Sequence, residues 1–474
     1  MSFTVEKIGG TSMSRVHELR DTLFLPHGVS GDIYGRIFVV SAFGGITNLL
    51  LEHKKTGESG VYARFANADN DHGWHEALNT VTTEMQAAHA VVLDHPADIA
   101  QADAFVSERI EGARNCLIDL QRLCSYGHFR LAEHMLQIRE LLSGLGEAHS
   151  AFVTTLMLQR AGVSARFVDL SGWRDQGEVS LAERIKGAME GVDPAQEMPI
   201  VTGYAQCAEG LMREYDRGYS EVTFSRLAAL IGAREAIIHK EFHLSSADPN
   251  LVGVGVARKL GHTNYDVADQ MSNMGMEAIH PKAAKTLRQA DVPLRVVNCF
   301  DPDDPGTLID DRPAEYAAVE MITGLDIIAL EVFEQDMVGV KGYDATILEV
   351  LTRHDVRIVS KTSNANTITH YLDASLKIMR RVEKDLAKAY SGAEVSARPL
   401  AMASIIGRDL RGLSVLTRGL QALAGADMAC LGASQGPRNV DVQFILERED
   451  LKPAIKALHH DLIEGQKQRL KKVA

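Results

Sequence analysis

Short apolar runs alternate with longer amphipathic stretches over roughly the first three hundred residues of the chain. Each run ends in a glycine or a polar turn, which is typical of a buried parallel strand. Between the runs, apolar positions recur at helical spacing, as at Val16, Leu19 and Leu23. This alternation predicts an α/β sheet with helices on both faces. The predicted strands are Thr4–Val5, Ile37–Val40, Ala236–Ile238, Leu294–Asn298 and, together with the turns that follow them, Ala165–Trp173 and Met198–Gln206.

A long stretch of polar and amphipathic sequence, His53–Leu145, interrupts this alternation and predicts mostly helix. Its histidines are dispersed, as on solvated helix faces rather than in a metal site. The overlapping stretch Leu141–Val163 contains Gly144 and Gly146. These glycines predict a turn, followed by an apolar helix that begins near Glu147.

A stretch rich in aspartate and proline, Asp301–Pro313, is the clearest candidate domain boundary. Beyond it the pattern changes to compact β-α-β units, with strands at Asp326–Phe333 and Met402–Asp409. Two copies of a small ferredoxin-like unit fit this pattern. We therefore predict a domain of residues 1–312, in which 53–145 is a largely helical insertion, and two small domains of residues 313–395 and 396–474.

Composition narrows the classes of function. The chain has 474 residues and a formal net charge of −13, which argues against a nucleic-acid or anionic-membrane partner. Its five cysteines show no paired metal spacing, so a reduced cytoplasmic protein is the simplest interpretation. The start, MSFTVEK, has no apolar signal core, and no apolar run is long enough to span a bilayer.

Two glycine pairs follow the first two predicted strands. Gly9 and Gly10 follow Lys7 in the segment EKIGGTSMS, and Gly44 and Gly45 follow the second strand. Glycine lets a backbone approach a phosphate closely, a helix start aims N–H groups at the anion, and a lysine adds a full positive charge. Because parallel strands end at one edge of a sheet, both turns are expected to line one phosphate-binding cleft. An ordinary strand-to-helix turn is the alternative for each pair.

The order of segments along nearly the whole chain resembles that of the aspartate kinases of the amino-acid-kinase family. The tail resembles two ACT domains, and the pattern is similar to the subgroup of aspartate kinases associated with ectoine synthesis. The segments that are similar to family motifs, in the family's order, are KIGGTS, VVSAFGGITNLLL, LSGLGE, SADP, YDVADQMSNMGMEAIHP and PLRVVNCFDPDDPGTLI.

The segment DRGYSEVTF keeps Arg217 and Ser220 of a further family motif. The chain departs from the family on the adenine and phosphate side, with Glu221 for an aspartate, HKEFH (239–243) for a Thr-Asp-Val-Asp-Gly loop, Asn250 for an arginine and Glu277 for a lysine. These departures leave the nucleotide contacts open. Lys240 is expected to compensate by contacting phosphate, and a solvated loop lysine is the alternative.

The resemblance implies an enzyme that transfers the γ-phosphoryl group of ATP to the side-chain carboxylate of L-aspartate. Lysine, threonine, methionine and ectoine synthesis share this first step. The acceptor carboxylate is already ionised at neutral pH, so no general base is required, and catalysis consists of positioning and charge neutralisation. Mg²⁺ is expected to bridge the β- and γ-phosphates, and no protein ligand to it is predicted.

The resemblance also implies roles for single residues. Lys7 should hold the transferring phosphoryl group, and Glu221 should orient Lys7 or a metal-bound water. Arg217 suits the α-carboxylate of aspartate and Glu147 suits its ammonium group, with a surface ion pair as the alternative for each. The expected aspartate site comprises Thr47, Glu147, Arg217 and Ser220, and the expected nucleotide site comprises Lys7, Gly9, Gly10, Ser41, Gly44, Gly45, Lys240 and Asp248.

The turn that holds Gly339, Gly342 and Asp344 corresponds to a place where ACT domains often bind amino acids. Gln435 and Asn439 lie in the matching stretch of the second unit, which is often a domain-pairing strand. An amino-acid effector and a homodimer or higher oligomer are therefore expected, with dimerisation alone as the alternative. Two rival functions stay open: a kinase of another small carboxylate, such as glutamate or acetylglutamate, and a non-catalytic amino-acid sensor.

Overall fold

The computed structural model describes residues 3–29, 31–54, 56–67, 72–175, 177–215, 218–276, 279–313 and 316–465. The chain divides into two compact units. The first unit comprises residues 1–243 and 279–311, and the second comprises residues 244–278 and 312–474. The segment 244–278 thus packs with the C-terminal part of the chain, although the sequence-based division places it in the first domain.

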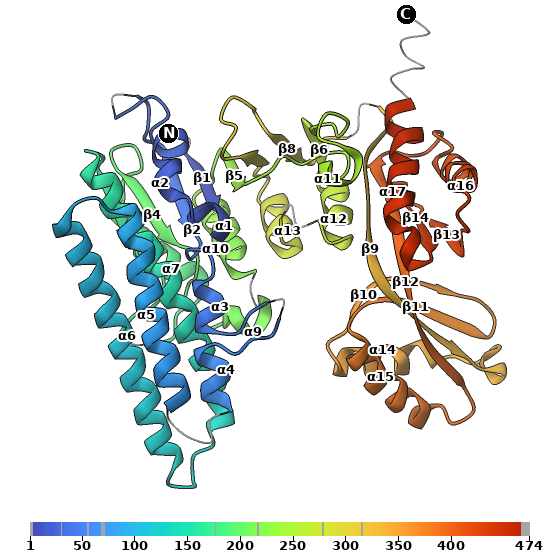
Figure 1. The fold of residues 1–474 in the computed structure, drawn as a ribbon, viewed down its shortest axis with the longest axis horizontal. Helices are drawn as coiled ribbons and strands as arrows, with labels where there is room; N and C mark the ends of the chain where they lie inside the picture. The colour runs from blue at the N-terminus through green and yellow to red at the C-terminus, as the bar shows by residue number, and fades with distance from the viewer. Residues whose placement is uncertain are drawn as a thin grey trace, which may run out of the picture. The chain divides into compact units, whose positions relative to one another are not determined.

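The first unit is built on a mostly parallel sheet, as the apolar runs predict (Figure 1). β1 lies in the middle, parallel to β2 on one side and to β5 on the other. The last strand of this unit, β8, is antiparallel to β7 and lies inside the Asp- and Pro-rich stretch that was predicted to be a domain boundary. The strands, in spatial order, are β3 (Ala165–Val168), β4 (Met198–Thr202), β2 (Arg36–Val40), β1 (Thr4–Ile8), β5 (Glu235–Lys240), β7 (Leu294–Asn298) and β8 (Thr307–Asp310).

Helices surround this sheet. α7 packs on β2, β3 and β4, whereas α10 packs on β1, β2 and β5. Together with α5 and α6, α7 forms the long helices of the predicted insertion. The longer helices are α5 (His72–Val92), α6 (Pro96–Cys124), α7 (Met135–Arg160), α8 (Leu181–Met189), α10 (Tyr219–Leu230) and α13 (Pro281–Gln289), and the short ones are α1 (Gly10–Met13), α2 (Val16–Leu19), α3 (Ile46–Leu50), α4 (Val61–Ala66) and α9 (Leu211–Tyr215).

The course of α7 differs from the prediction of a turn followed by a helix that begins near Glu147. The helix continues through Gly144 and Gly146 without a break. A Cβ on Gly144 would lie 3.0 Å from Tyr204 Cδ1, and one on Gly146 would lie 3.0 Å from Ala42 Cβ. The two glycines therefore allow close packing of the helix on the loops beside it, at the cost of some helix propensity.

The second unit contains an antiparallel sheet of six strands in the order β10-β11-β9-β12-β14-β13. Two long strands, β9 and β12, pair along their whole lengths in the middle of this sheet. The predicted boundary between residues 395 and 396 falls within β12. The strands are β9 (Ala318–Phe333), β10 (Arg357–Ser363), β11 (Thr367–Asp373), β12 (Glu394–Arg408), β13 (Gly432–Gln435) and β14 (Asp441–Leu446).

The sheet of the second unit carries two separate hydrophobic cores on one face. One core joins the second half of β9 to α14 (Tyr343–Arg353) and α15 (Leu376–Ala389). The other joins the first half of β9 to α16 (Val415–Gly425) and α17 (Leu451–His459). Each helical pair therefore covers a ferredoxin-like module, and both modules share β9 and β12.

The opposite face of this sheet packs against α12 (Tyr265–Asn273), through Val267 and Met271. The short helix α11 (Pro249–Val252) and the strand β6 (His262–Asn264) precede α12 in the same unit. Within the described residues, no helix combines the length and the apolar character that crossing a bilayer requires.

Candidate active site

Lys7 lies at the carboxyl end of the central strand β1, where the first glycine turn begins. It pairs with Val39 of β2 and with Ile238 of β5, so a neighbouring strand flanks it on each side. The residue is only 8% exposed. A Cβ on Gly9 would lie 3.8 Å from Lys7 Nζ, so the ammonium group lies against the turn. The lysine and the glycine turn therefore belong to one small site.

The second glycine turn lies beside the first, as expected from neighbouring parallel strands. The Gly44 N–H donates to Ser14 Oγ at 3.0 Å. A Cβ on Gly44 would lie 2.3 Å from the same oxygen, and one on Gly10 would lie 3.1 Å from Ala42 O. Gly45, the residue directly before α3, has a φ of +89°. A residue with a side chain would adopt this backbone conformation only with strain. Both turns therefore depend on glycine for their close approach.

Glu221, in the first turn of α10, faces Lys7. Its Oε1 lies 3.4 Å from Lys7 Nζ, and its Oε2 accepts a hydrogen bond from the backbone N–H of His280. Burial would raise the pKa of this carboxyl, but the positive charges of Lys7 and Lys240 and the His280 N–H outweigh burial and lower the pKa. Glu221 is therefore ionised at neutral pH and holds the lysine ammonium in place.

Glu147 lies deep in α7 and is 2% exposed. Its Oε1 accepts a hydrogen bond from Ser220 Oγ at 2.7 Å, and Ser220 Oγ in turn accepts one from Ser41 Oγ at 3.4 Å. Burial raises the pKa of Glu147 to about 8, although Ser220 and the charge of Lys7 act in the opposite direction. A Cβ on Gly203 would lie 2.7 Å from Glu147 Oε2, so the glycine after β4 makes room for this carboxyl.

Two buried carboxyls thus flank Lys7 in opposite protonation states at neutral pH, with Glu221 charged and Glu147 mostly neutral. The difference comes from their surroundings, because Glu221 has two neighbouring cations whereas burial dominates at Glu147. The other predicted substrate residue in this region, Thr47, is half-buried in α3.

A buried ion network beneath the turns was not predicted from the sequence. Glu6 of β1 accepts two hydrogen bonds from Arg36, at 2.7 and 2.8 Å, and lies 2.7 Å from His239 Nε2. Burial opposes ionisation of Glu6, but Arg36 and His239 lower its pKa well below the usual range. The alternation of side chains along β1 places Glu6 and Lys7 on opposite faces of the sheet. A glutamate inside an apolar central strand is the signal that could have revealed this network.

The structure leaves part of the predicted nucleotide side open. Lys240 ends β5 and is close enough to influence the pKa of Glu221. Asp248 belongs to the second unit, where its side chain accepts a hydrogen bond from Asn250 N at 2.9 Å and caps α11. Arg217 and Glu277 lie outside the described residues.

A cavity of about 540 Å³ opens beside α7 in the first unit. The Tyr204 hydroxyl donates to Glu140 in its wall, and Met212 N donates to the same carboxylate at 2.8 Å. Burial raises the pKa of Glu140. Arg213, which also lines the cavity, was not singled out from the sequence.

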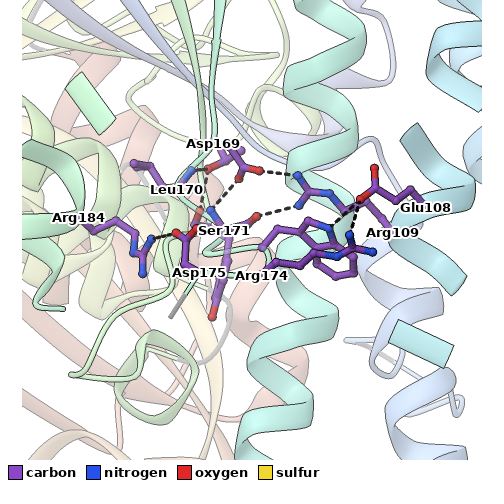
Figure 2. Close-up of polar contacts among 11 residues, drawn as sticks. Glu108, Arg109, Asp169, Leu170, Ser171, Arg174, Asp175 and Arg184 are labelled. Atoms are coloured by element: carbon purple, nitrogen blue, oxygen red, sulfur yellow. Dashed lines mark hydrogen bonds and ion pairs between the residues drawn. The ribbon is translucent and has the colours of Figure 1, made fainter. Parts of the chain in front are cut away.

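Figure 2 shows the polar contacts that hold the loop after β3 in the wall of this cavity. Arg109 donates to Asp169 Oδ2 at 2.5 Å and to Ser171 Oγ at 3.0 Å. Arg184 donates to Asp175 Oδ2 at 2.5 Å on the other side of the loop. These arginines therefore hold the loop in place, and each pairs its positive charge with an aspartate of that loop.

One group of side chains among the described residues has a spacing that a cation could use: His243, Asp301 and Asp304. His243 Nε2 lies 2.9 Å from Asp301 Oδ2, and His243 Nδ1 lies 3.6 Å from Asp304 Oδ1. The imidazole already forms a hydrogen bond with Asp301 and lies close to Asp304, so the group does not by itself indicate a metal.

The predicted effector residues lie in the second unit. Gly342 has a φ of +104° and begins α14, while Gly339 has a φ of +77°. Asp344 accepts from Lys361 Nζ at 2.5 Å, and the buried His370 lies 3.2 Å from its other oxygen. In the second module, Gln435 Nε2 donates to Asn439 Oδ1 at 3.2 Å in the turn between β13 and β14.

A parallel sheet with two glycine turns, a buried lysine and paired carboxyls at one edge defines a phosphate-binding α/β protein. Residues 2–298 match the model of the amino acid kinase family, and the chain belongs to that family. It is 50% identical over 463 residues to the aspartate kinase Ask_Ect of Stutzerimonas stutzeri, covering 97% of each chain.

Two solved structures of Escherichia coli aspartokinase III share the fold. One is a complex with lysine and aspartate, and the other is a complex with aspartate and ADP. Each has a TM-score of 0.70 and 19% identity, and each comparison covers 97% of this chain and 99% of the other. The predicted architecture, a parallel-sheet α/β domain followed by ferredoxin-like modules, is confirmed.

Proposed function

We propose that this protein is an aspartate kinase that transfers the γ-phosphoryl group of ATP to the side-chain carboxylate of L-aspartate. The observation that carries the proposal is that Lys7, Glu147 and Glu221 lie together at the carboxyl edge of the sheet. The 50% sequence identity to a relative named as an aspartate kinase supports it. The same relative supports a role in ectoine synthesis.

Phosphoryl transfer in this site depends on charge neutralisation. Lys7 holds the transferring group, and the N–H groups of Gly9 and Gly10 approach the phosphates, with Gly44 and Gly45 facing them from the next strand. Glu221 keeps the lysine ammonium oriented through its contact at 3.4 Å. The aspartate carboxylate attacks without a general base, because it is already ionised. Ser41 and Lys240 add polar groups on the nucleotide side.

Recognition of aspartate uses the two groups that the reaction leaves unchanged. Glu147 pairs with the α-ammonium, and Ser220 holds the carboxylate for this contact at 2.7 Å. Arg217 binds the α-carboxylate through its planar guanidinium. Thr47 offers a hydroxyl from the half-buried α3. A substrate with a longer side chain would displace its reacting carboxylate relative to Lys7.

Mg²⁺ supplies charge neutralisation at the β- and γ-phosphates when it is bound. The ionised Glu221 fits a role as acceptor for a metal-bound water, because its pKa is lowered although the residue is buried. Lys7, which contacts the same glutamate at 3.4 Å, would neutralise part of the remaining phosphate charge.

The two ferredoxin-like modules serve as ACT-type regulatory domains and join chains into a dimer or higher oligomer. The E. coli relative, whose complex contains lysine, supports an amino-acid effector. In this chain the ammonium group of Lys361 already donates a hydrogen bond to the Asp344 carboxylate at 2.5 Å. An effector with an ammonium group would have to displace that contact.

Trapping of the acyl phosphate with hydroxylamine tests the function. The purified chain is incubated with ATP and Mg²⁺ and with aspartate, glutamate or acetylglutamate in parallel. A hydroxamate with aspartate alone supports the proposal. Product with glutamate or acetylglutamate in preference would assign another acceptor, and no product with any acid would favour the non-catalytic sensor.

A further inference from the structure

A short hydrogen bond joins the loop that follows β5 to the first glycine turn. Ser12 Oγ donates to Glu241 Oε1 at 2.6 Å. Ser12 lies in α1, two residues after the glycine pair, and is fully buried, whereas Glu241 is half-buried. The two residues are 229 positions apart in the chain, so only the fold brings them together. No role has been assigned to Glu241 above, although it belongs to the segment HKEFH (239–243).

Further contacts fix the loop after β5 from the side of β7. The backbone N–H of Cys299, directly after β7, donates to the carbonyl of Lys240, the last residue of β5, at 2.9 Å. His243 Nε2 lies 2.9 Å from Asp301 Oδ2 in the loop that follows β7. The loops after β5 and β7 therefore support each other, and Glu241 joins this support to the glycine turn.

A carboxylate is an unfavourable neighbour for a phosphate, because like charges repel. Part of the charge of Glu241 is offset by Arg15. The pKa of Arg15 is raised chiefly by its hydrogen bond to Glu18, and the charge of Glu241 makes a smaller contribution in the same direction. The hydrogen bond from Ser12 gives the carboxylate a use, since an ionised acceptor holds a hydroxyl more strongly than a neutral one does.

The order of the strands places the loop of Glu241 on the nucleotide side of the proposed site. Glu147, the expected partner of the aspartate ammonium, lies against Gly203, which follows β4. β2 lies between β4 and β1, whereas β5 lies on the other side of β1. In phosphoryl transfer the attacking and leaving oxygens are roughly in line. An aspartate held by Glu147 approaches Lys7 from the β4 side, so the ADP group lies towards β5.

We propose that Glu241 is a positioning residue for nucleotide binding. Its carboxylate holds Ser12, and through Ser12 the first glycine turn, against the loop after β5, so that the turn keeps the shape that receives the phosphates. Glu241 acts through Ser12 and not by contact with the phosphates. The inference rests on the proposed function for phosphate binding at the glycine turns, and it does not depend on which acid accepts the phosphoryl group.

Isothermal titration of the full-length protein with ADP, in the presence of Mg²⁺ and without aspartate, tests the proposal. Glu241→Ala removes the acceptor, Ser12→Ala removes the donor, and the double variant removes both. Glu241→Gln keeps an acceptor oxygen and removes the charge. The matched control is Glu183→Ala, because Glu183 accepts from Ser180 Oγ at the same distance, 2.6 Å, at the start of α8. The melting temperature of each variant is measured alongside.

We expect Glu241→Ala and Ser12→Ala each to weaken ADP binding about tenfold, because a hydrogen bond to a charged group is lost. The double variant should lose no more than either single variant, since both changes remove one contact. Glu241→Gln should bind ADP within about twofold of wild type. Glu183→Ala should lower the melting temperature and leave the affinity for ADP unchanged. In steady-state kinetics, Glu241→Ala should raise the Michaelis constant for ATP and not that for aspartate.

Several outcomes would overturn the proposal. Tighter ADP binding by Glu241→Ala would mean that the carboxylate only repels phosphate, and equal losses in Glu241→Ala and Glu241→Gln would assign the effect to charge. Additive losses in the double variant, or an equal loss in Glu183→Ala, would also contradict a specific contact with Ser12. A wild type that binds ADP but forms no hydroxamate would refute the proposed function, while the variants would still decide this inference. A wild type that does not bind ADP would overturn both.

Discussion

Binding of aspartate should release a proton from Glu147. The pKa of this carboxyl is raised to about 8 by burial, so about nine-tenths of it is protonated at pH 7. A neutral acid cannot pair with an ammonium group, so the substrate must bind the ionised form. Removing the proton at pH 7 costs about 1.4 kcal/mol, and the apparent dissociation constant of aspartate should rise about tenfold for each pH unit below 8. Above pH 8 the constant should level off.

Isothermal titration with aspartate at pH 7, in two buffers that differ in enthalpy of ionisation, measures the proton directly. We expect release of about one proton in wild type and of none in Glu147→Gln, whose amide can still accept from Ser220. Glu140→Gln is the matched control, because Glu140 is another glutamate of α7, half-buried, whose pKa is also raised by burial. Its proton release should resemble that of wild type. Binding without proton release, together with an affinity that is constant from pH 6 to 8, would refute the assignment of Glu147 as the ammonium partner.

Three further changes test the site and its support. Lys7→Met should lower kcat by about 10²–10³-fold with little change in the Michaelis constant for aspartate, as steady-state kinetics would show, because the lost charge acts on the transferring phosphoryl group. Gly203→Ala should lower the melting temperature and the activity, because the new Cβ would lie 2.7 Å from Glu147 Oε2. We expect this contact to destabilise the protein by about 1–3 kcal/mol. The control is Gly187→Ala in α8, where nothing lies within 4 Å of the new Cβ and the change should stabilise the helix by up to about 1 kcal/mol. Glu6→Gln should destabilise the protein by about 3–5 kcal/mol in chemical denaturation at neutral pH. Because the folded-state pKa of Glu6 is lowered, its contribution is present above about pH 4.5 and lost as the pH falls, so the difference between Glu6→Gln and wild type should shrink below pH 4.5.

The sheet and the two glycine turns of the first unit were predictable because their signals are local. A short apolar run followed by paired glycines specifies a buried strand and a close turn, and the parallel pairing of β1 with β2 brings both turns together. Gly144 and Gly146 misled the prediction of α7, because a glycine that permits close packing looks the same in sequence as a glycine that permits a turn. Only the neighbours, Tyr204 and Ala42, distinguish the two cases.

Long-range partners explain what else the sequence did not reveal. Arg36 and His239 keep Glu6 ionised from two other strands, and nothing in the spacing of these residues along the chain connects them. The split of protonation states between Glu147 and Glu221 likewise depends on which cations lie near each carboxyl. The length of β9 was underestimated, because its first half pairs with a strand that comes much later in the chain.

The shared strand β9 has a consequence for synthesis on the ribosome. Gly324, in its first half, pairs with Ala403, whereas Val332, in its second half, pairs with Ile368 of β11. The second half of β9 can therefore pair with β11 before β12 is synthesised, while the edge of β9 that faces β12 is still unpaired. At typical translation rates this strand edge stays uncovered for several seconds, and the nascent chain is most exposed to misassociation during that interval.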